Sequence, residues 1–334
     1  MKALVLYGPN NYNVENEWPM PEVPDGWALV KVAYAGICGS DIPRFFTTGS
    51  YHHPMIIGHE FSGTVVKAAK GGKVAEGTPV AILPIIPCGE CEGCRETHQP
   101  FHCNHYQFIG SRNDGGFAQY VAVPDQNLFP LSSENELKMG AMIELLSVGL
   151  HVIRRSGIDH SKAVVFGAGP IGLACAMWLK FLGNDVTIVD IREFSLSIAR
   201  ELGLHAITFD ELPDDKQFGY AYEASGSTAA LIKSIEVTKD LGAITVVGRN
   251  TRDTVISVKE FEKLMRKEIT LNGCWGYNLD GEWENMRAFL KAYDPNCMIS
   301  HMVQLEGVPE VLESVVRARG NYCKIMIDME GRDK

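Results

Sequence analysis

The chain has 334 residues, and this length favours two domains over one. Hydrophobic residues make up 46% of the chain and charged residues 22%, which is ordinary for a globular protein, and no apolar run reaches the roughly eighteen residues of a membrane span. The formal net charge of −10 at pH 7, without any block of Lys and Arg, argues against nucleic acid and anionic membranes as partners.

Residues 1–130 are rich in Gly, Pro and short β-type runs. The first run, Met1–Tyr7, predicts a strand, and it lacks the basic start and long apolar stretch of a secretory signal, so we expect a cytoplasmic protein. Turn residues separate the runs, which predicts a mostly β domain. The other strands are predicted at Trp27–Ala35, Phe61–Lys67, Pro79–Pro84 and Phe117–Val123.

From about residue 161 onward, short apolar runs alternate with helical stretches. Such alternation predicts a parallel sheet built from βαβ units. The Asp214-Asp215-Lys216 stretch is expected to be a solvated loop. The predicted strands are Ala163–Gly167, Val186–Asp190, Ala206–Phe209, Tyr220–Ala224, Ala243–Gly248 and Lys324–Asp328. The predicted helices are Pro170–Leu182, Glu193–Leu202, Ala229–Lys239, Gly281–Tyr293 and Val308–Arg319.

A glycine-rich segment, Gly167-Ala-Gly-Pro-Ile-Gly172, follows a predicted strand and opens a predicted helix. Its glycines permit the tight turn, the approach of a pyrophosphate and close helix packing, and the helix N-terminus attracts phosphates. Asp190 ends the next predicted strand, where a carboxylate binds ribose hydroxyls and repels a 2′-phosphate. We therefore predict NAD as the cofactor. NADP is the alternative, because Arg192 could bind a 2′-phosphate. The expected cofactor-binding residues are Gly167, Gly169, Pro170, Ile171, Gly172, Asp190, Arg192 and Gly248.

Four of the nine cysteines crowd into sixteen residues, namely Cys88, Cys91, Cys94 and Cys103. Four thiolates from one loop suit tetrahedral Zn²⁺ and leave no position open for a substrate, so this zinc would be structural. A loop without metal, reduced or disulfide-linked, is the alternative. Three histidines of the same segment could compete as ligands, namely His98, His102 and His105.

A second set of metal-binding side chains is dispersed along the chain, namely Cys38, His59, Glu60 and Glu144. A thiolate, an imidazole and a carboxylate are plausible ligands of a zinc ion that keeps a fourth position open to water or an alcohol. Each side chain also has an ordinary structural interpretation, as a buried cysteine, a core histidine or a charge on a helix surface.

Six motifs in this order resemble the zinc-containing medium-chain dehydrogenase/reductase family, in its sorbitol dehydrogenase and threonine dehydrogenase branch. They are Gly36-Ile-Cys38-Gly-Ser40-Asp41, Gly58-His59-Glu60-Phe61-Ser62-Gly63, the Cys-x-x-Cys-x-x-Cys loop, Gly115-Gly116-Phe117-Ala118-Gln119-Tyr120, Glu144-Leu-Leu-Ser-Val-Gly-Leu-His151 and Gly167-x-Gly169-x-x-Gly172. Three further segments resemble the galactitol-1-phosphate 5-dehydrogenase subfamily. They begin at Cys38, Phe108 and Arg266.

The resemblance implies an α/β protein with a GroES-like β catalytic domain and a Rossmann cofactor domain with a doubly wound parallel sheet. We expect residues 1–145 and 281–334 to form the catalytic domain with both zinc sites. Residues 146–280 are expected to form the NAD-binding domain. The resemblance also implies a homodimer or homotetramer, using strands of the cofactor domain near 255–275.

Carried over by motif, Cys38, His59 and Glu144 become ligands of a catalytic zinc. Glu60 is expected beside this zinc, bound to it directly or through water. The four-cysteine loop becomes the structural zinc site, so two Zn²⁺ per chain are expected.

Three features depart from the family pattern. Eight residues separate Cys94 from Cys103, where the family usually has seven. Leu145 follows Glu144, where this branch usually has Pro. Pro43 stands where other alcohol dehydrogenases carry a relay histidine, so a histidine relay through that position is excluded.

The resemblance implies hydride transfer from a secondary alcohol of a polyol or polyol phosphate to NAD, giving a ketose or ketose phosphate. Ser40 is the candidate proton acceptor. A substrate phosphate needs cations, and Arg44 and Arg112 are the candidates, with His52 and His53 as helpers. A threonine-type or other secondary-alcohol dehydrogenase, and a non-catalytic NAD-sensing member of the family, are the alternatives.

Overall fold

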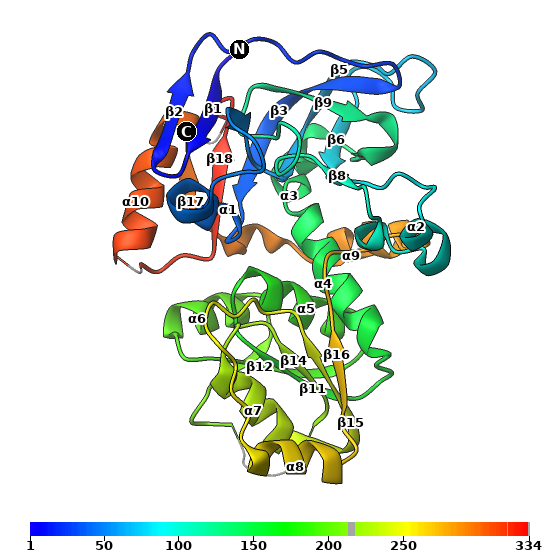
Figure 1. The fold of residues 1–334 in the computed structure, drawn as a ribbon, viewed down its shortest axis with the longest axis vertical. Helices are drawn as coiled ribbons and strands as arrows, with labels where there is room; N and C mark the ends of the chain where they lie inside the picture. Colours follow the sequence, from blue (N-terminus) through cyan, green and yellow to red (C-terminus); the bar gives the residue numbers. More distant parts are fainter. Residues whose placement is uncertain (213–217, 319, 333–334) are drawn as a thin grey trace. The chain divides into compact units, whose positions relative to one another are not determined.

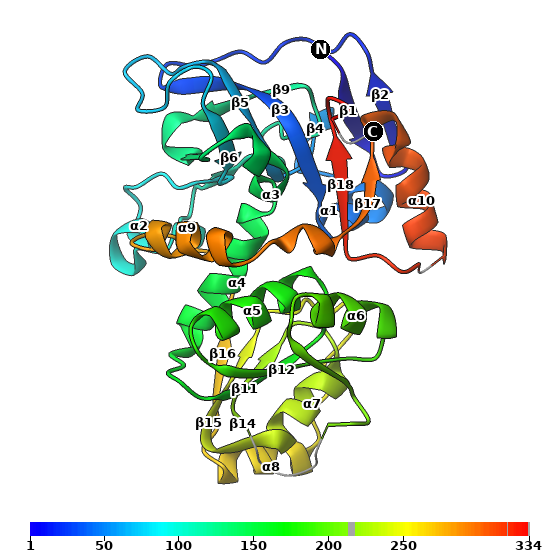
Figure 2. The ribbon, with the colours of Figure 1, turned by 180° about the vertical axis from the view of Figure 1, so that it is seen from behind.

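The computed structural model describes residues 1–212, 218–318 and 320–332 (Figures 1 and 2). The chain divides into two compact units, the first being Met1–Glu144 with Ile299–Lys334 and the second Leu145–Met298. The boundary predicted at 281 therefore differs from the observed one, because residues 281–298 belong to the second unit. The solvated loop expected at 214–216 lies outside the described residues.

The first unit is built around a sheet whose strands run in the order β10-β6-β5-β3-β18-β17, with β9 also paired to β3. The long central strand β3 is antiparallel to β5, β9 and β18. Its register places Gly36 opposite Glu60 on β5, and Ile37 opposite Ile325 on β18. The strands are β3 (Trp27–Ile37), β5 (Glu60–Lys67), β6 (Pro79–Ile82), β9 (Tyr120–Pro124), β10 (Leu128–Pro130), β17 (Ile299–Val303) and β18 (Lys324–Asp328).

Smaller elements complete the first unit. A second sheet has the order β2-β1-β4, and β7 pairs with β8. The apolar side chains of β1 are fully buried and join the same hydrophobic core as β3 and α10. These strands are β1 (Ala3–Gly8), β2 (Asn11–Glu15), β4 (Met55–Ile56), β7 (Ile85–Ile86) and β8 (Gln107–Phe108). The helices are α1 (Asp41–Pro43), a π-helical turn (Arg44–Thr48), α2 (Glu92–Thr97), α3 (Leu137–Gly140) and α10 (Val308–Ala318).

The second unit contains a parallel sheet in the order β13-β12-β11-β14-β15-β16. The chain starts in the middle at β11, moves outward to β13, then returns and continues outward to β16, which is the predicted doubly wound arrangement. The strands are β11 (Lys162–Phe166), β12 (Asp185–Asp190), β13 (His205–Thr208), β14 (Phe218–Glu223), β15 (Thr238–Val246) and β16 (Thr270–Gly273). The helices are α4 (Ile143–Ser156), whose first two residues belong to the first unit, α5 (Pro170–Phe181), α6 (Glu193–Glu201), α7 (Thr228–Val237), α8 (Val258–Arg266) and α9 (Trp283–Ala292).

Helix α9 explains why residues 281–298 belong to the second unit. The ring of Phe289 is stacked on that of Trp178 in α5, with centroids 4.0 Å apart, and Tyr293 is stacked on Phe289. Stacked aromatic rings bury a large apolar area, so these contacts determine which unit the helix joins. No helix among the described residues is both long and apolar enough to cross a membrane.

The helix predicted at Ala229–Lys239 is shorter than expected. It ends at Val237, and Thr238 already begins β15. The buried Lys267 Nζ donates to three carbonyls at this point, those of Ile235, Glu236 and Thr238. A cation at a helix C-terminus satisfies carbonyls that have no partner within the helix, so it stabilises an end there.

Candidate functional site

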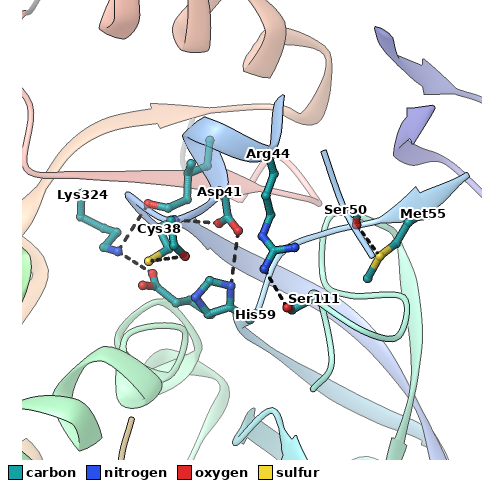
Figure 3. A network of polar contacts seen from close by, with 11 residues as sticks. Cys38, Asp41, Arg44, Ser50, Met55, His59, Ser111 and Lys324 are labelled. Carbon is teal, nitrogen blue, oxygen red and sulfur yellow. Dashed lines mark hydrogen bonds and ion pairs between the residues drawn. The ribbon is translucent and has the colours of Figure 1, made fainter. Parts of the chain in front are cut away.

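Three of the four dispersed metal-binding side chains converge in the first unit (Figure 3). One ligand atom each of Cys38, His59 and Glu60 lie within 4.8 Å of one another. Cys38 directly follows β3, whereas Glu60 begins β5, the antiparallel neighbour. The pairing of Gly36 with Glu60 therefore brings two segments together that are separated by some twenty residues in the sequence.

Asp41 orients this group, although the sequence analysis did not include it among the site residues. It is fully buried, and its Oδ2 accepts a hydrogen bond of 3.0 Å from the Cys38 amide. Its Oδ1 lies 3.4 Å from His59 Nδ1. Burial by itself lowers the pKa of His59, but the charges of Asp41 and Cys38 outweigh burial and raise this pKa well above the usual value. Because Nδ1 faces Asp41, Nε2 is the nitrogen left for a metal.

Lys324 is a second residue that the sequence analysis missed. Its Nζ lies 2.5 Å from Glu60 Oε2, and the two side chains are 2% and 1% exposed. A Cβ on Gly36 would lie 2.5 Å from that carboxylate oxygen, so the ion pair crosses β3 at a position without a side chain. Burial lowers the pKa of Lys324, but the charge of Glu60 outweighs burial and raises it. The available signal was a lysine opening a strand, Lys324–Asp328, whose three central residues are all apolar.

Glu144, the fourth predicted member, is not one of the side chains whose ligand atoms lie within 4.8 Å of one another. It is buried near the start of α4, and Leu145 is accommodated inside the same helix. Burial raises the pKa of Glu144, and the nearby charge of His59 opposes this effect. The structure therefore places Glu144 in the same charged surroundings as His59 but outside the three-residue group.

The donor set of the three-residue group fits Zn²⁺, since a thiolate, an imidazole and a carboxylate are its usual protein ligands. Ser40, the predicted proton acceptor, is half-buried and donates a hydrogen bond of 3.3 Å from Oγ to Cys38 Sγ. Its hydroxyl is therefore directed at the sulfur of a candidate ligand. Pro43 lies in α1, where it has no group that could transfer a proton.

The four-cysteine loop also has the geometry of a metal site. Neighbouring sulfurs lie 3.5, 3.6, 3.8 and 4.0 Å apart. Tetrahedral zinc with sulfur bonds of about 2.3 Å requires a sulfur–sulfur separation of roughly 3.8 Å, and a disulfide is far shorter. The eight-residue gap before Cys103 is thus compatible with the site, and none of the three nearby histidines joins this group.

Backbone amides point at the sulfurs of this loop. The Cys103 Sγ accepts hydrogen bonds from the amides of Cys88 and His105, and the Cys91 Sγ accepts one from Asn104. The bond from Asn104 is the main cause that lowers the pKa of Cys91 to about 6. Amide donors stabilise the thiolate form, which is the form that binds zinc.

We predict that Cys103→Ser removes one zinc per chain and lowers the melting temperature by on the order of 10 °C, because binding energy at such a site is folding energy. Metal analysis and thermal unfolding measure the two effects. Cys323→Ser is the matched control, since Cys323 is also buried but lies outside the loop. Equal zinc contents in Cys103→Ser and the unsubstituted protein would contradict the prediction.

The glycine-rich segment has the predicted form in the second unit. It joins β11 to α5, and Gly167 has a φ of 99°, which favours glycine. A Cβ on Gly172 would lie 1.8 Å from the Gly167 carbonyl oxygen, whereas one on Gly169 would meet nothing within 4 Å. No side chain caps the N-terminus of α5, and Pro170 stands in its first turn. The amides there are available to a phosphate, so this segment fits a dinucleotide.

Asp190 holds the glycine-rich segment in place. Its Oδ2 accepts a hydrogen bond of 2.7 Å from the Ala168 amide, and its Oδ1 accepts one of 2.8 Å from the Arg192 amide. The Arg192 guanidinium lies 3.6 Å from the same carboxylate. Arg192 is thus paired with Asp190, which weakens the argument for a 2′-phosphate at this position.

Glu223 was also missed from the sequence. It is buried at the end of β14, and its Oε1 accepts hydrogen bonds from the amides of Ser225 and Ser227. Its main-chain carbonyl accepts hydrogen bonds from Val247 and Gly248, each of 2.9 Å. This residue therefore ties together the loops that follow β14 and β15 at the carboxyl edge of the sheet, where doubly wound proteins bind ligands.

The two candidate phosphate-binding arginines lie near each other in the first unit. The Cζ of Arg44 is 5.7 Å, and that of Arg112 4.5 Å, from the centre of the Tyr51 ring. Arg44 also donates a hydrogen bond of 2.8 Å to Ser111 Oγ (Figure 3). His53 uses both ring nitrogens in contacts within its own unit, and His52 contacts the Arg112 carbonyl. The structure therefore groups the arginines but supports no helper role for His53.

Two sequence-family profiles match the chain. One covers the candidate metal sites and the other begins in the glycine-rich segment. The profile described as "Alcohol dehydrogenase GroES-like domain" matches residues 24–133. The profile described as "Zinc-binding dehydrogenase" matches residues 170–292. The first match includes Cys38, His59 and the four-cysteine loop, and the second begins inside the glycine-rich segment.

Full-length relatives agree with these matches. The galactitol 1-phosphate 5-dehydrogenase of Escherichia coli strain K12 is 31% identical over 307 residues, which cover 86% of this chain and 88% of that protein. The sorbitol dehydrogenase of Bacillus subtilis strain 168 is 27% identical over 350 residues, covering 98% and 97%. The crystal structure of galactitol-1-phosphate dehydrogenase from Escherichia coli superposes with a TM-score of 0.90 at 28% identity, covering 98% and 100% of the two chains. The chain therefore belongs to the zinc-containing medium-chain dehydrogenase/reductase family and is an oxidoreductase that acts on CH–OH donors.

Proposed function

We propose that the protein oxidises a secondary alcohol of a polyol or polyol phosphate to a ketone, with NAD as hydride acceptor and zinc at the site of Cys38, His59 and Glu60. The observation that carries the proposal is the convergence of these three side chains beside a buried lysine. A thiolate, an imidazole and a carboxylate within reach of one another are the usual protein ligands of zinc, which supports a metal at this position.

Zinc bound there would act as a Lewis acid toward the substrate hydroxyl and make its proton easier to remove. Cys38 and His59 would hold the metal, with Glu60 or Glu144 completing the set. Asp41 holds the His59 ring in one tautomer and orientation. Lys324 neutralises Glu60 and so limits the negative charge around the metal.

Proton removal is assigned to Ser40. Its hydroxyl lies within hydrogen-bond distance of Cys38 Sγ, so it is held at the candidate metal site. We propose that Oγ accepts the proton of the substrate hydroxyl while its own proton passes to water. Pro43 is unable to accept it, so the route does not follow α1.

NAD is favoured over NADP because Asp190 closes β12 beside the glycine-rich segment. We predict that Asp190→Ser raises the KM for NAD by about 10- to 100-fold, the cost of losing charge-assisted hydrogen bonds. The same substitution lowers the preference for NAD over NADP, because it removes the repulsion of a 2′-phosphate. Initial rates with each cofactor test this, and Asp185→Ser at the exposed opposite end of β12 is the control. An unchanged KM for NAD in Asp190→Ser would refute the assignment.

The substrate class rests on the relatives and on the two arginines. Relatives named for galactitol 1-phosphate and sorbitol oxidation match most of this chain. Arg44 and Arg112 place two positive charges in the first unit, which also contains the proposed zinc site for the reacting hydroxyl. A phosphorylated polyol would use both features.

A substrate panel tests the proposal. We expect NADH formation with alditols or alditol phosphates, faster than with threonine, and we expect about two zinc ions per chain. The panel consists of galactitol, galactitol 1-phosphate, sorbitol and threonine, each with NAD and NADP, and it identifies both the substrate class and the cofactor. Oxidation of threonine alone would select the threonine-type alternative. A protein with one zinc and no activity would support a non-catalytic role.

We further propose a homodimer or homotetramer. In the described part of the sheet, β16 stands at the edge of the strand order. Helix α8, which precedes it, exposes the apolar side chains Val258, Phe261 and Met265. An edge strand with exposed apolar residues nearby favours pairing with a second chain. Sedimentation equilibrium measures the molar mass in solution, and the mass of a monomer would contradict the proposal.

A further inference from the structure

Two cations share one tyrosine ring in the first unit. Arg44 and Arg112 both lie against Tyr51, with Cζ distances of 5.7 and 4.5 Å from the ring centre. Within the described residues, neither guanidinium forms an ion pair with a carboxylate. Two neighbouring like charges repel each other, and this protein carries 41 acidic side chains that could have neutralised them. Such a pair is typical of a site that receives an anion from outside.

Arg112 contacts two tyrosine rings. Its Cζ lies 4.5 Å from the Tyr51 ring centre and 4.3 Å from that of Tyr106. Aromatic faces stabilise a guanidinium by cation–π and stacking contacts, and they leave its N–H groups at the edge. A guanidinium edge matches a phosphate oxygen pair. Tyr51 is 64% exposed and Arg112 is half-buried, so this cluster lies at the surface of the unit.

The same segment connects Arg112 to the candidate metal group. The amides of Ser111 and Arg112 both donate to the Phe108 carbonyl, at 3.0 and 2.8 Å. The Phe108 ring in turn lies 5.6 Å from that of His59. One tight turn after Phe108 therefore carries both Arg112 and Ser111, the hydrogen-bond partner of Arg44. Both arginines are thus connected to Phe108, which packs against the candidate zinc ligand His59.

Tyr106 is fixed by the four-cysteine loop. It follows Cys103 by three residues, and the Cys103 Sγ accepts a hydrogen bond from the intervening His105 amide. Phe101, which precedes Cys103 in the same loop, contacts both Tyr106 and Phe108, with ring centres 6.1 and 5.8 Å away. The loop is thus packed against Tyr106 and Phe108, in the first half of the segment that leads to Arg112.

We propose that Tyr106 and Tyr51 are specificity-determining positioning residues, whose rings hold Arg112 in place for the terminal phosphate of the substrate. This inference rests on the proposed function, because the phosphate is the end of the substrate remote from the reacting hydroxyl. The four-cysteine loop then contributes to substrate choice as well as to stability, through Tyr106.

The test compares Tyr106→Leu, which removes the ring, with Tyr106→Phe, which keeps it. Tyr106→Leu is expected to raise the KM for galactitol 1-phosphate about tenfold, the scale of a partly desolvated cation–π contact, and to leave kcat unchanged. Its KM for galactitol stays within about twofold. Tyr106→Phe keeps the ring but loses the hydrogen bond between the Tyr106 hydroxyl and Arg112, so it should raise the KM for galactitol 1-phosphate by less than Tyr106→Leu does. Equal increases for the two substrates would mean a merely structural role and would overturn the proposal.

A double-mutant cycle isolates the contact with Arg112. If Tyr106 acts through Arg112, then Tyr106→Leu adds nothing to Arg112→Ala for galactitol 1-phosphate. Additive effects would overturn the proposal. Calorimetric binding of inorganic phosphate gives a readout independent of catalysis, and its Kd should rise about tenfold in Tyr106→Leu.

The phosphate measurement also separates this proposal from the proposed function. Phosphate binding that depends on Tyr106, in a protein that oxidises no polyol, would support the anion site and refute the polyol dehydrogenase. Oxidation of galactitol by a protein that binds no phosphate would refute the anion site and leave the dehydrogenase in place.

Discussion

Replacing His59 with Ala is expected to lower kcat/KM for the polyol substrate by on the order of 10⁴-fold, which is the scale of removing one member of a catalytic unit. His59 contributes a ligand atom to the three-residue group, and Asp41 holds its ring in place. Without the imidazole, Cys38 and Glu60 retain two donors, too few for a stable zinc site. The zinc content, measured by metal analysis, should therefore fall from about two ions per chain to about one.

The matched control is His301→Ala. His301 is half-buried in β17 of the same unit, and its ring contacts Ser300 rather than a metal-binding side chain. This variant should retain both zinc ions and most of the activity. If His59→Ala keeps both zinc ions and its activity, the zinc assignment to this group is wrong. If it loses the metal but keeps activity, the catalytic role of the zinc is wrong.

Lys324→Met is expected to lower the free energy of unfolding of the first unit by about 3–5 kcal/mol, the usual cost of leaving one member of a buried ion pair alone. Glu60 is 1% exposed, and Lys324 is its cationic partner at 2.5 Å. In the zinc-free protein, in which the change is to be measured, removing the lysine leaves the buried Glu60 carboxylate without its cationic partner. Urea unfolding, followed by a probe in the first unit, measures the change in midpoint.

Two further variants make this prediction specific. Lys2→Met removes an exposed lysine, paired with Glu306, and should cost no more than about 1 kcal/mol. The double variant Glu60→Gln with Lys324→Met leaves no buried charge at this position and should recover most of the loss. A single variant as stable as the unsubstituted protein would show that water or another cation compensates Glu60.

The local sites could be predicted from the sequence. The four cysteines lie within one loop, so their approach depends on a few turns, and their sulfurs do come together. The glycine-rich segment is likewise continuous, and its strand, turn and helix follow one another as expected. Asp190 was placed correctly at the end of its strand because the βαβ rhythm determines where that strand stops.

The structure brings three of the four dispersed side chains into one group, and the ligand roles expected of them stay predictions. Cys38, His59 and Glu60 were chosen by motif and do converge, whereas Glu144 does not join the group of mutually close ligand atoms. Asp41 was overlooked although it stands three residues from Cys38, because a buried carboxylate in a short helix looks like an ordinary turn residue. Nothing local to Lys324 links it to Glu60, from which 263 residues separate it in the chain.

The amino-acid sequence by itself determined the fold class, the family and the residues of the sites that are continuous in the chain, because turns and periodicity act over a few residues. The tertiary structure decided which charges meet. Only the register of β3 with its two neighbours brings Glu60 and Lys324 together across Gly36, and only the turn after Phe108 places Arg112 against Tyr51. Strand register depends on packing of the whole core, so these contacts between distant segments are not encoded in any short stretch of the chain.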